Sequence, residues 1–144
     1  MGSYIDKSDL DLALSRAELT GLTDDEGAGI PNDEVIARAI ADAEALVESY
    51  AGKRYAVPLS SATAMVKRLC VVIARFNLCD RRRNMPESVR ETYQDAIKLL
   101  QDVSTGKAKL DGLSEAESAS GKVTSAGVVD GGERIFDRQK LKVM

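Results

Sequence analysis

Residues 32–52 read NDEVIARAIADAEALVESYAG and carry the clearest secondary-structure signal in the chain. Asn32 is a favourable amino-terminal helix cap, and Asp33 and Glu34 follow in the first turn, where the helix dipole favours acidic residues. Gly52 is a typical helix stop. The pattern predicts one long amphipathic helix. Its apolar positions, which recur at helical spacing, are Val35, Ile36, Ala39, Ile40, Ala43, Leu46, Val47 and Tyr50.

Helical spacing predicts another helix on each side of this one. The earlier helix begins at Asp6 or Ser8, which can both act as caps, and ends near Thr20. The later helix spans about residues 62–80 and follows a connector at residues 53–59, whose proline favours extended backbone.

A fourth helix is predicted between Asn84 and Gly106. The sequence Asn84-Met85-Pro86-Glu87 has capping-box spacing with proline in the first turn, and Gly106 is the expected stop. Residues 107–132 are rich in Ser, Gly, Ala and charged residues, which is typical of a linker. We therefore divide the chain into a helical domain at residues 1–106 and a flexible tail with a docking arm at residues 107–144.

The composition agrees with a core of packed helices. Of the 144 residues, 44% are hydrophobic but only 4% are aromatic, and there is no Trp. The core must therefore consist mostly of Leu, Ile, Val and Ala, which suits helix-on-helix packing. We predict an all-α protein with a small four-helix-bundle-like domain and an extended carboxy-terminal arm.

The arm contains an apolar pair within a polar tail, in the sequence ERIFDR at residues 133–138. A polar tail gains nothing by exposing a β-favouring apolar segment, so we expect this segment to dock, as a short strand or turn, on its own domain or on a neighbouring subunit. The tail buries too little on its own to offset its ordering entropy, so we predict that it folds against a neighbouring subunit or the portal. The predicted docking residues are Arg134, Ile135, Phe136, Arg138 and Leu141.

A second group of candidate partner-binding residues lies in the connector, at Arg54, Tyr55 and Pro58. Two readings are open for this group. It could form an exposed docking site, or Tyr55 could cover the end of the helical bundle together with Tyr50 and Leu59. The sequence favours the covering role.

Residues 66–83 are locally basic, with six basic residues against one acidic residue, although the whole chain has a net charge of −3. Arg68, Arg75 and Arg82 are seven residues apart and share a helix face. This face could bind nucleic acid, but aromatic residues do not alternate with it, and pairing with acidic residues is the favoured reading. The expected acidic partners are Asp42, Glu44 and Glu48 of the second predicted helix, or acidic residues of a partner protein.

The sequence offers little for catalysis or metal binding. There is no His, and Cys70 and Cys79 are predicted to lie on opposite helix faces as buried apolar residues. The acidic loop at residues 24–27 fails the EF-hand pattern because Ala28 follows where an acidic ligand should stand. We expect a non-enzymatic protein without a cofactor or metal.

Read in order, these segments resemble the head–tail connector proteins (neck adaptors, or head-completion proteins) of Mu-like tailed bacteriophages. The most telling segment is SYAGKRYAVPL at residues 49–59, which is similar to that family's Tyr-x-Gly-x-Arg-Tyr-x-x-Pro-Leu stretch. The other similar segments are residues 4–10, 22–24, 35–43, 73–78, 89–96, 106–107 and 134–138.

This resemblance implies a structural protein in the neck of a virion. It implies a homo-oligomeric ring of about twelve copies, seated on the portal protein, with a tail-side neck or tail-terminator protein beneath. DNA would pass through the lumen without specific binding. The chain shows no signal peptide or membrane-spanning run, so we expect it in the host cytoplasm during assembly. The alternative is a small DNA-binding regulator or packaging component that uses the basic face.

Overall fold

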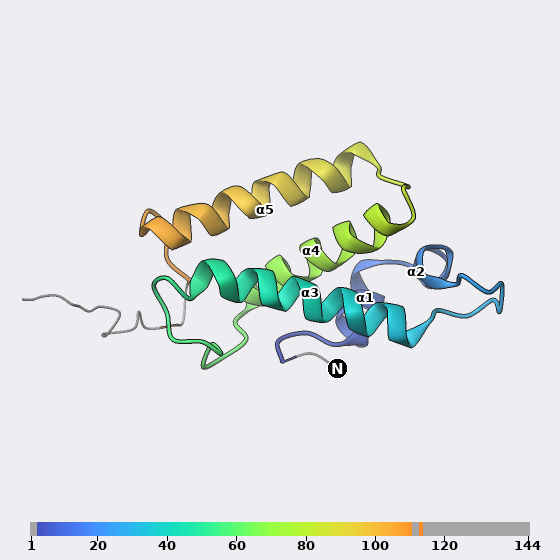
Figure 1. Cartoon of the computed structure of the whole chain (residues 1–144), viewed down its shortest axis with the longest axis horizontal. Coiled ribbons are helices and arrows are strands. Elements are labelled where there is room, and N and C mark those ends of the chain that lie inside the picture. The colour runs from blue at the N-terminus through green and yellow to red at the C-terminus, as the bar shows by residue number, and fades with distance from the viewer. Residues whose placement is uncertain (1–2, 111–112, 114–144) are drawn as a thin grey trace, which may run out of the picture.

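The computed structural model describes residues 3–110 and residue 113, and this part of the chain contains five helices and no strand. The prediction of an all-α protein is therefore confirmed. The helices are α1 (Lys7–Ala13), α2 (Arg16–Thr23), α3 (Asp33–Ala51), α4 (Ala64–Arg81) and α5 (Glu87–Thr105). The three long helices pack against one another, and α1 and α2 pack on α3 and α4 as a short fourth element (Figure 1).

The first predicted helix is wrong in one respect, because the chain breaks it in two. Asp6, one of the two residues predicted as the cap, caps α1 and forms a reciprocal capping box with Asp9. Leu14 is extended, and the Ser15 hydroxyl then accepts a hydrogen bond from the Glu18 amide and starts α2. This local cap lets the chain turn between two helices while Leu14 stays buried.

The long helices largely follow their predicted limits. Asn32 caps α3 and Gly52 ends it, as the sequence indicates. The start of α5 differs, because Pro86 occupies the cap position and makes no side-chain cap hydrogen bond, so the predicted capping box at Asn84 is wrong. Gly106 ends α5 in the left-handed conformation, with φ of 87°, as expected for a helix-stop glycine.

The core is mostly aliphatic and is centred on α3, α4 and α5, with buried leucines of α1 and α2 as further members. Cys70 and Cys79 are buried in it as free thiols, in agreement with the sequence analysis. Burial raises the pKa of the Cys70 thiol to about 12 and also raises the pKa of Cys79. The packed body continues past Gly106, since Leu110 is fully buried.

A buried carboxylate holds the amino-terminal segment. Glu44, on α3, accepts hydrogen bonds from the backbone amides of Ser3, Tyr4 and Ile5 at 2.9, 2.7 and 3.0 Å. Its side chain therefore satisfies three donors that precede α1. The expectation that Glu44 pairs with the basic face of α4 is wrong.

Candidate functional site

The predicted connector group divides between the core and the surface. Tyr55 is only 3% exposed, and its hydroxyl accepts a hydrogen bond from the Leu110 amide at 2.9 Å. It therefore covers the end of the helical body, which is the reading that the sequence favours. Arg54 lies beside Gly106, whereas Pro58 is exposed after a cis peptide bond.

Two of the three arginines of the predicted basic face form ion pairs with acidic residues of the same chain. Arg75 pairs with Glu18 of α2 at 2.8 Å, and Arg82 pairs with Asp25, in the loop after α2, at 2.9 Å. The acidic partners of these two arginines therefore lie in and after α2, and not on α3 as predicted. Arg68 differs, because it is exposed and makes no ion pair within residues 3–110.

The acidic loop after α2 is organised by protein donors. Arg81 donates hydrogen bonds to Asp25 from Nη2 and Nη1, at 2.6 and 3.3 Å, and lowers the pKa of that carboxyl group. Asp24 accepts hydrogen bonds from the amides of Gly29 and Ala28, which lower its pKa. These contacts fix the loop to the carboxy-terminal end of α4. They occupy the carboxylates of Asp24 and Asp25, which belong to the loop that was compared with an EF-hand.

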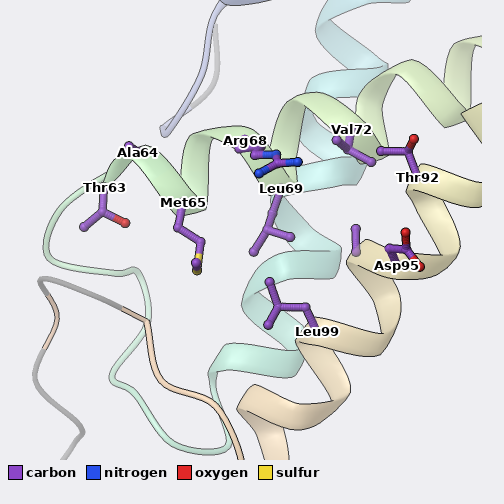
Figure 2. Close-up of a pocket in the computed structure, with 10 residues that line it drawn as sticks. Thr63, Ala64, Met65, Arg68, Leu69, Val72, Thr92, Asp95 and Leu99 are labelled. Atoms are coloured by element: carbon purple, nitrogen blue, oxygen red, sulfur yellow. The ribbon is translucent and has the colours of Figure 1, made fainter.

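A groove of about 610 Å³ lies between the first half of α4 and the middle of α5. Met65, Leu69 and Leu99 point toward one another from the two helices and give the groove an apolar floor (Figure 2). Arg68 on α4 and Asp95 on α5 line the same groove and are exposed. We call this feature the α4–α5 groove; it is also lined by Thr63, Ala64, Val72, Thr92 and Ala96.

One turn beyond Val72, the two helices close on each other. The rings of Phe76 on α4 and Tyr93 on α5 stack with their centroids 3.6 Å apart and an interplanar angle of 12°. This stack joins the helices beyond the groove, whose other end lies at Thr63, before the first turn of α4. The groove is thus a feature of two firmly packed helices.

A second hollow, of about 350 Å³, lies between α1 and α4. It shares Arg68 and Val72 with the α4–α5 groove, so the two hollows flank one exposed strip of α4. Leu12 lines the second hollow and is 88% exposed. We call the two hollows and the strip between them the α4 surface.

The sequence analysis missed several members of this surface. Leu12 could have been found, because it is an apolar residue out of phase with the buried stripe of its helix. Asp95 and Leu99 gave no such signal, since their role depends on how α5 lies against α4. The predicted arm residues Arg134, Ile135, Phe136, Arg138 and Leu141 lie outside the described residues.

Two further observations concern the part of the chain that the structure describes. It contains no group of three or more His, Cys, Asp or Glu side chains arranged to hold a metal ion. None of its helices combines the length and the apolar character needed to span a membrane.

All described residues except Ser3 fall within a match to a known phage family. A sequence model described as "Bacteriophage Mu, Gp36" matches residues 4–127. The chain is 30% identical over 139 residues to "Gene product J" of Escherichia phage Mu, covering 96% of each protein. It is 36% identical over 101 residues to the "Mu-like prophage FluMu protein gp36" of Haemophilus influenzae, covering 67% of this chain and 70% of that protein.

Proposed function

The chain belongs to the bacteriophage Mu Gp36 family, and from this premise we propose that it is a structural head–tail connector of a tailed-phage virion. In this role it forms a homo-oligomeric ring of about twelve copies between the portal protein and a tail-side neck or tail-terminator protein. DNA passes through the lumen without specific binding. The protein is non-enzymatic and acts in the virion neck.

The observation that carries this proposal is the α4 surface. A closed ring built from head-to-tail contacts needs two different, complementary surfaces on each subunit. The α4 surface suits one of them, because it combines two partly apolar hollows with an arginine that has no ion-pair partner within residues 3–110. Leu12 adds an exposed apolar side chain, and covering it with another molecule would stabilise the complex.

The ion pairs of α4 count against the alternative of a DNA-binding regulator or packaging component. Phosphate binding needs cations that are free to replace counterions. Arg75, Arg81 and Arg82 are already paired with carboxylates of the same chain. Binding DNA through these residues would require those pairs to break, and only Arg68 of the predicted DNA face is free of such a pair.

The direct test is electron microscopy of the full chain mixed with the portal ring encoded in the same genome. An added annular layer on the portal would support the connector role and give its symmetry. Absence of a layer, combined with salt-dependent binding of the same preparation to duplex DNA, would overturn the connector role in favour of the DNA-binding alternative.

A further inference from the structure

We propose that the α4–α5 groove binds residues 133–138 of a neighbouring copy of this chain. This inference rests on the ring proposed above and names the contact that closes it. The segment reads ERIFDR, with the apolar pair Ile135 and Phe136 between two charged pairs. In such a ring each subunit has one groove and one segment, so arm exchange fills every groove.

The apolar part of the groove suits the apolar pair of the segment. Met65, Leu69 and Leu99 form its floor, and its volume of about 610 Å³ lies in the range of pockets that bind drug-sized ligands. Leu69 is buried, whereas Met65 and Leu99 remain partly exposed in the isolated chain. Covering those two side chains with Ile135 and Phe136 would remove apolar surface from water on both partners.

The charges of the groove suit the charged ends of the segment. Arg68 lines the groove from α4 and Asp95 lines it from α5. Neither forms an ion pair within residues 3–110. The segment has an acid and a base on each side of its apolar pair: Glu133-Arg134 before it and Asp137-Arg138 after it. In either chain direction, one end can therefore offer an acid to Arg68 while the other offers a base to Asp95.

The length of the chain allows the segment to reach a neighbour. The body ends where the Leu110 amide bonds to Tyr55, beside the connector that leads into α4. Nineteen residues, 114–132, separate Leu113 from Glu133. A chain of that length can extend to at most about 65 Å.

The second hollow favours a neighbouring copy over the same chain as the source of the segment. The α1–α4 hollow, which Leu12 lines, borders the groove along Arg68 and Val72. A six-residue segment is too small to fill both hollows, whereas a second subunit can cover Leu12 and bring its own tail beside the groove. Two arrangements compete with this one. The segment could bind the groove of its own chain, or it could bind the portal protein instead of a groove.

Disulfide trapping in the assembled ring tests the contact. One full-length double variant carries Thr92→Cys with Phe136→Cys, and a second carries Leu99→Cys with Phe136→Cys. Thr92 is exposed, so its substitution should not disturb folding. Cys70 and Cys79 are buried and should stay unreactive. Gln101→Cys with Phe136→Cys is the matched control, because Gln101 is exposed on α5 but does not line the groove.

Each variant is loaded on the portal ring, oxidised mildly and run on a non-reducing gel. The proposal predicts a ladder of covalent oligomers for a groove variant and no ladder for the control. A disulfide within single chains would overturn it in favour of the same chain as the source. A cross-link to the portal, or no cross-link although microscopy shows the annular layer, would also overturn it. Absence of the layer would instead count against the connector role itself.

Discussion

The hydroxyl group of Tyr4 accepts a hydrogen bond from the backbone amide of Leu59 at 2.8 Å, across 55 residues of sequence. The same hydroxyl donates to a carboxylate oxygen of Glu48 on α3. In the same connector as Leu59, the hydroxyl group of Tyr55 accepts a hydrogen bond from the Leu110 amide. Two tyrosines thus fix the start of the chain and the exit from α5 to the connector before α4. Leu110 is therefore held at a defined place beside the connector.

Replacing Tyr4 with Phe should lower the free energy of unfolding by about 1–3 kcal/mol, because the buried Leu59 amide loses its acceptor. Urea unfolding of the purified chain measures this change. Tyr50→Phe is the matched control, since the Tyr50 hydroxyl makes no hydrogen bond within residues 3–110 and its loss should change stability little. Equal losses in the two variants would contradict the assigned role of the Tyr4 hydroxyl.

The same phenol predicts a pH dependence at the alkaline end. Burial and the hydrogen bond to Glu48 raise the pKa of Tyr4 from 10.0 to about 12. The folded state therefore holds this proton more tightly than the unfolded state. The resulting stability is complete below pH 10 and is lost as the pH rises toward 12. In Tyr4→Phe, the melting temperature should fall less steeply over this range than in the parent chain.

Replacing Glu44 with Ala should destabilise the fold by roughly 3 kcal/mol, because three backbone amides of residues 3–5 lose their common acceptor. Glu44→Gln keeps one oxygen and should cost less. Asp42→Ala, an exposed position on the same helix, should stay within about 0.5 kcal/mol of the parent chain. Chemical denaturation compares the three variants, and a loss in Asp42→Ala as large as in Glu44→Ala would exclude the anchoring role.

Asp25 should make the protein sensitive to acid. The hydrogen bond from Arg81 lowers its pKa below the ordinary value of 3.8, so the folded state releases this proton more readily than the unfolded state. The stability that follows is present above pH 3.8 and is lost as the pH falls through the lower, folded-state pKa. Asp25→Asn should therefore lower the melting temperature at pH 7, and the difference should shrink as the pH falls below 3.8. A difference that is constant with pH would show that the Arg81 ion pair does not contribute.

Local signals predicted much of this fold, whereas contacts between elements did not follow from them. Asn32 and Gly52 fix the ends of α3 through backbone chemistry that residues 32–52 contain in full. The role of Glu44 depends on where the amino-terminal segment lies, so its buried position could not be read from its own helix. The break at Leu14 was missed because apolar spacing continues across it, although Ser15 carried a usable cap signal. These differences separate what a single helix specifies from what packing decides.

The same contrast applies to the candidate site. The seven-residue spacing of Arg68, Arg75 and Arg82 predicted a shared face, but it could not show that two of the three have internal partners. The acidic partners of those two arginines are Glu18, within α2, and Asp25, just after α2. The sequence pattern predicted α1 and α2 as a single helix. The free arginine was thus identifiable only once α2 was placed beside α4.

Gly106 should not tolerate a side chain. Its φ is 87°, and a methyl group added there would lie 2.7 Å from Nη1 of Arg54. Gly106→Ala should therefore lower the free energy of unfolding by about 1–2 kcal/mol, from the left-handed backbone alone. Gly21→Ala is a control of opposite sign, because Gly21 lies within α2 with open space around it, and alanine should stabilise that helix by roughly 0.5–1 kcal/mol. Thermal unfolding of both variants checks the two signs.

Arg68→Glu separates the proposed connector role from DNA binding. Arg68 has no ion pair within residues 3–110, so this variant should keep the melting temperature of the parent chain. In the proposed ring, the new carboxylate would repel the acidic residues of the incoming segment, and the annular layer on the portal should weaken or disappear. Lys98→Glu makes the same charge change on the exposed side of α5 and should leave the layer intact.

The competing outcome is equally specific. A DNA-binding protein should lose duplex affinity in Arg68→Glu, with a smaller dependence of that affinity on salt, because one phosphate contact is removed. The connector role predicts weak DNA binding by both the parent chain and the variant. Portal binding and DNA binding measured on the same two preparations therefore decide between the roles. An unchanged layer in Arg68→Glu would show that Arg68 takes no part in the subunit contact. Loss of the layer in Lys98→Glu as well would show only a general effect of charge.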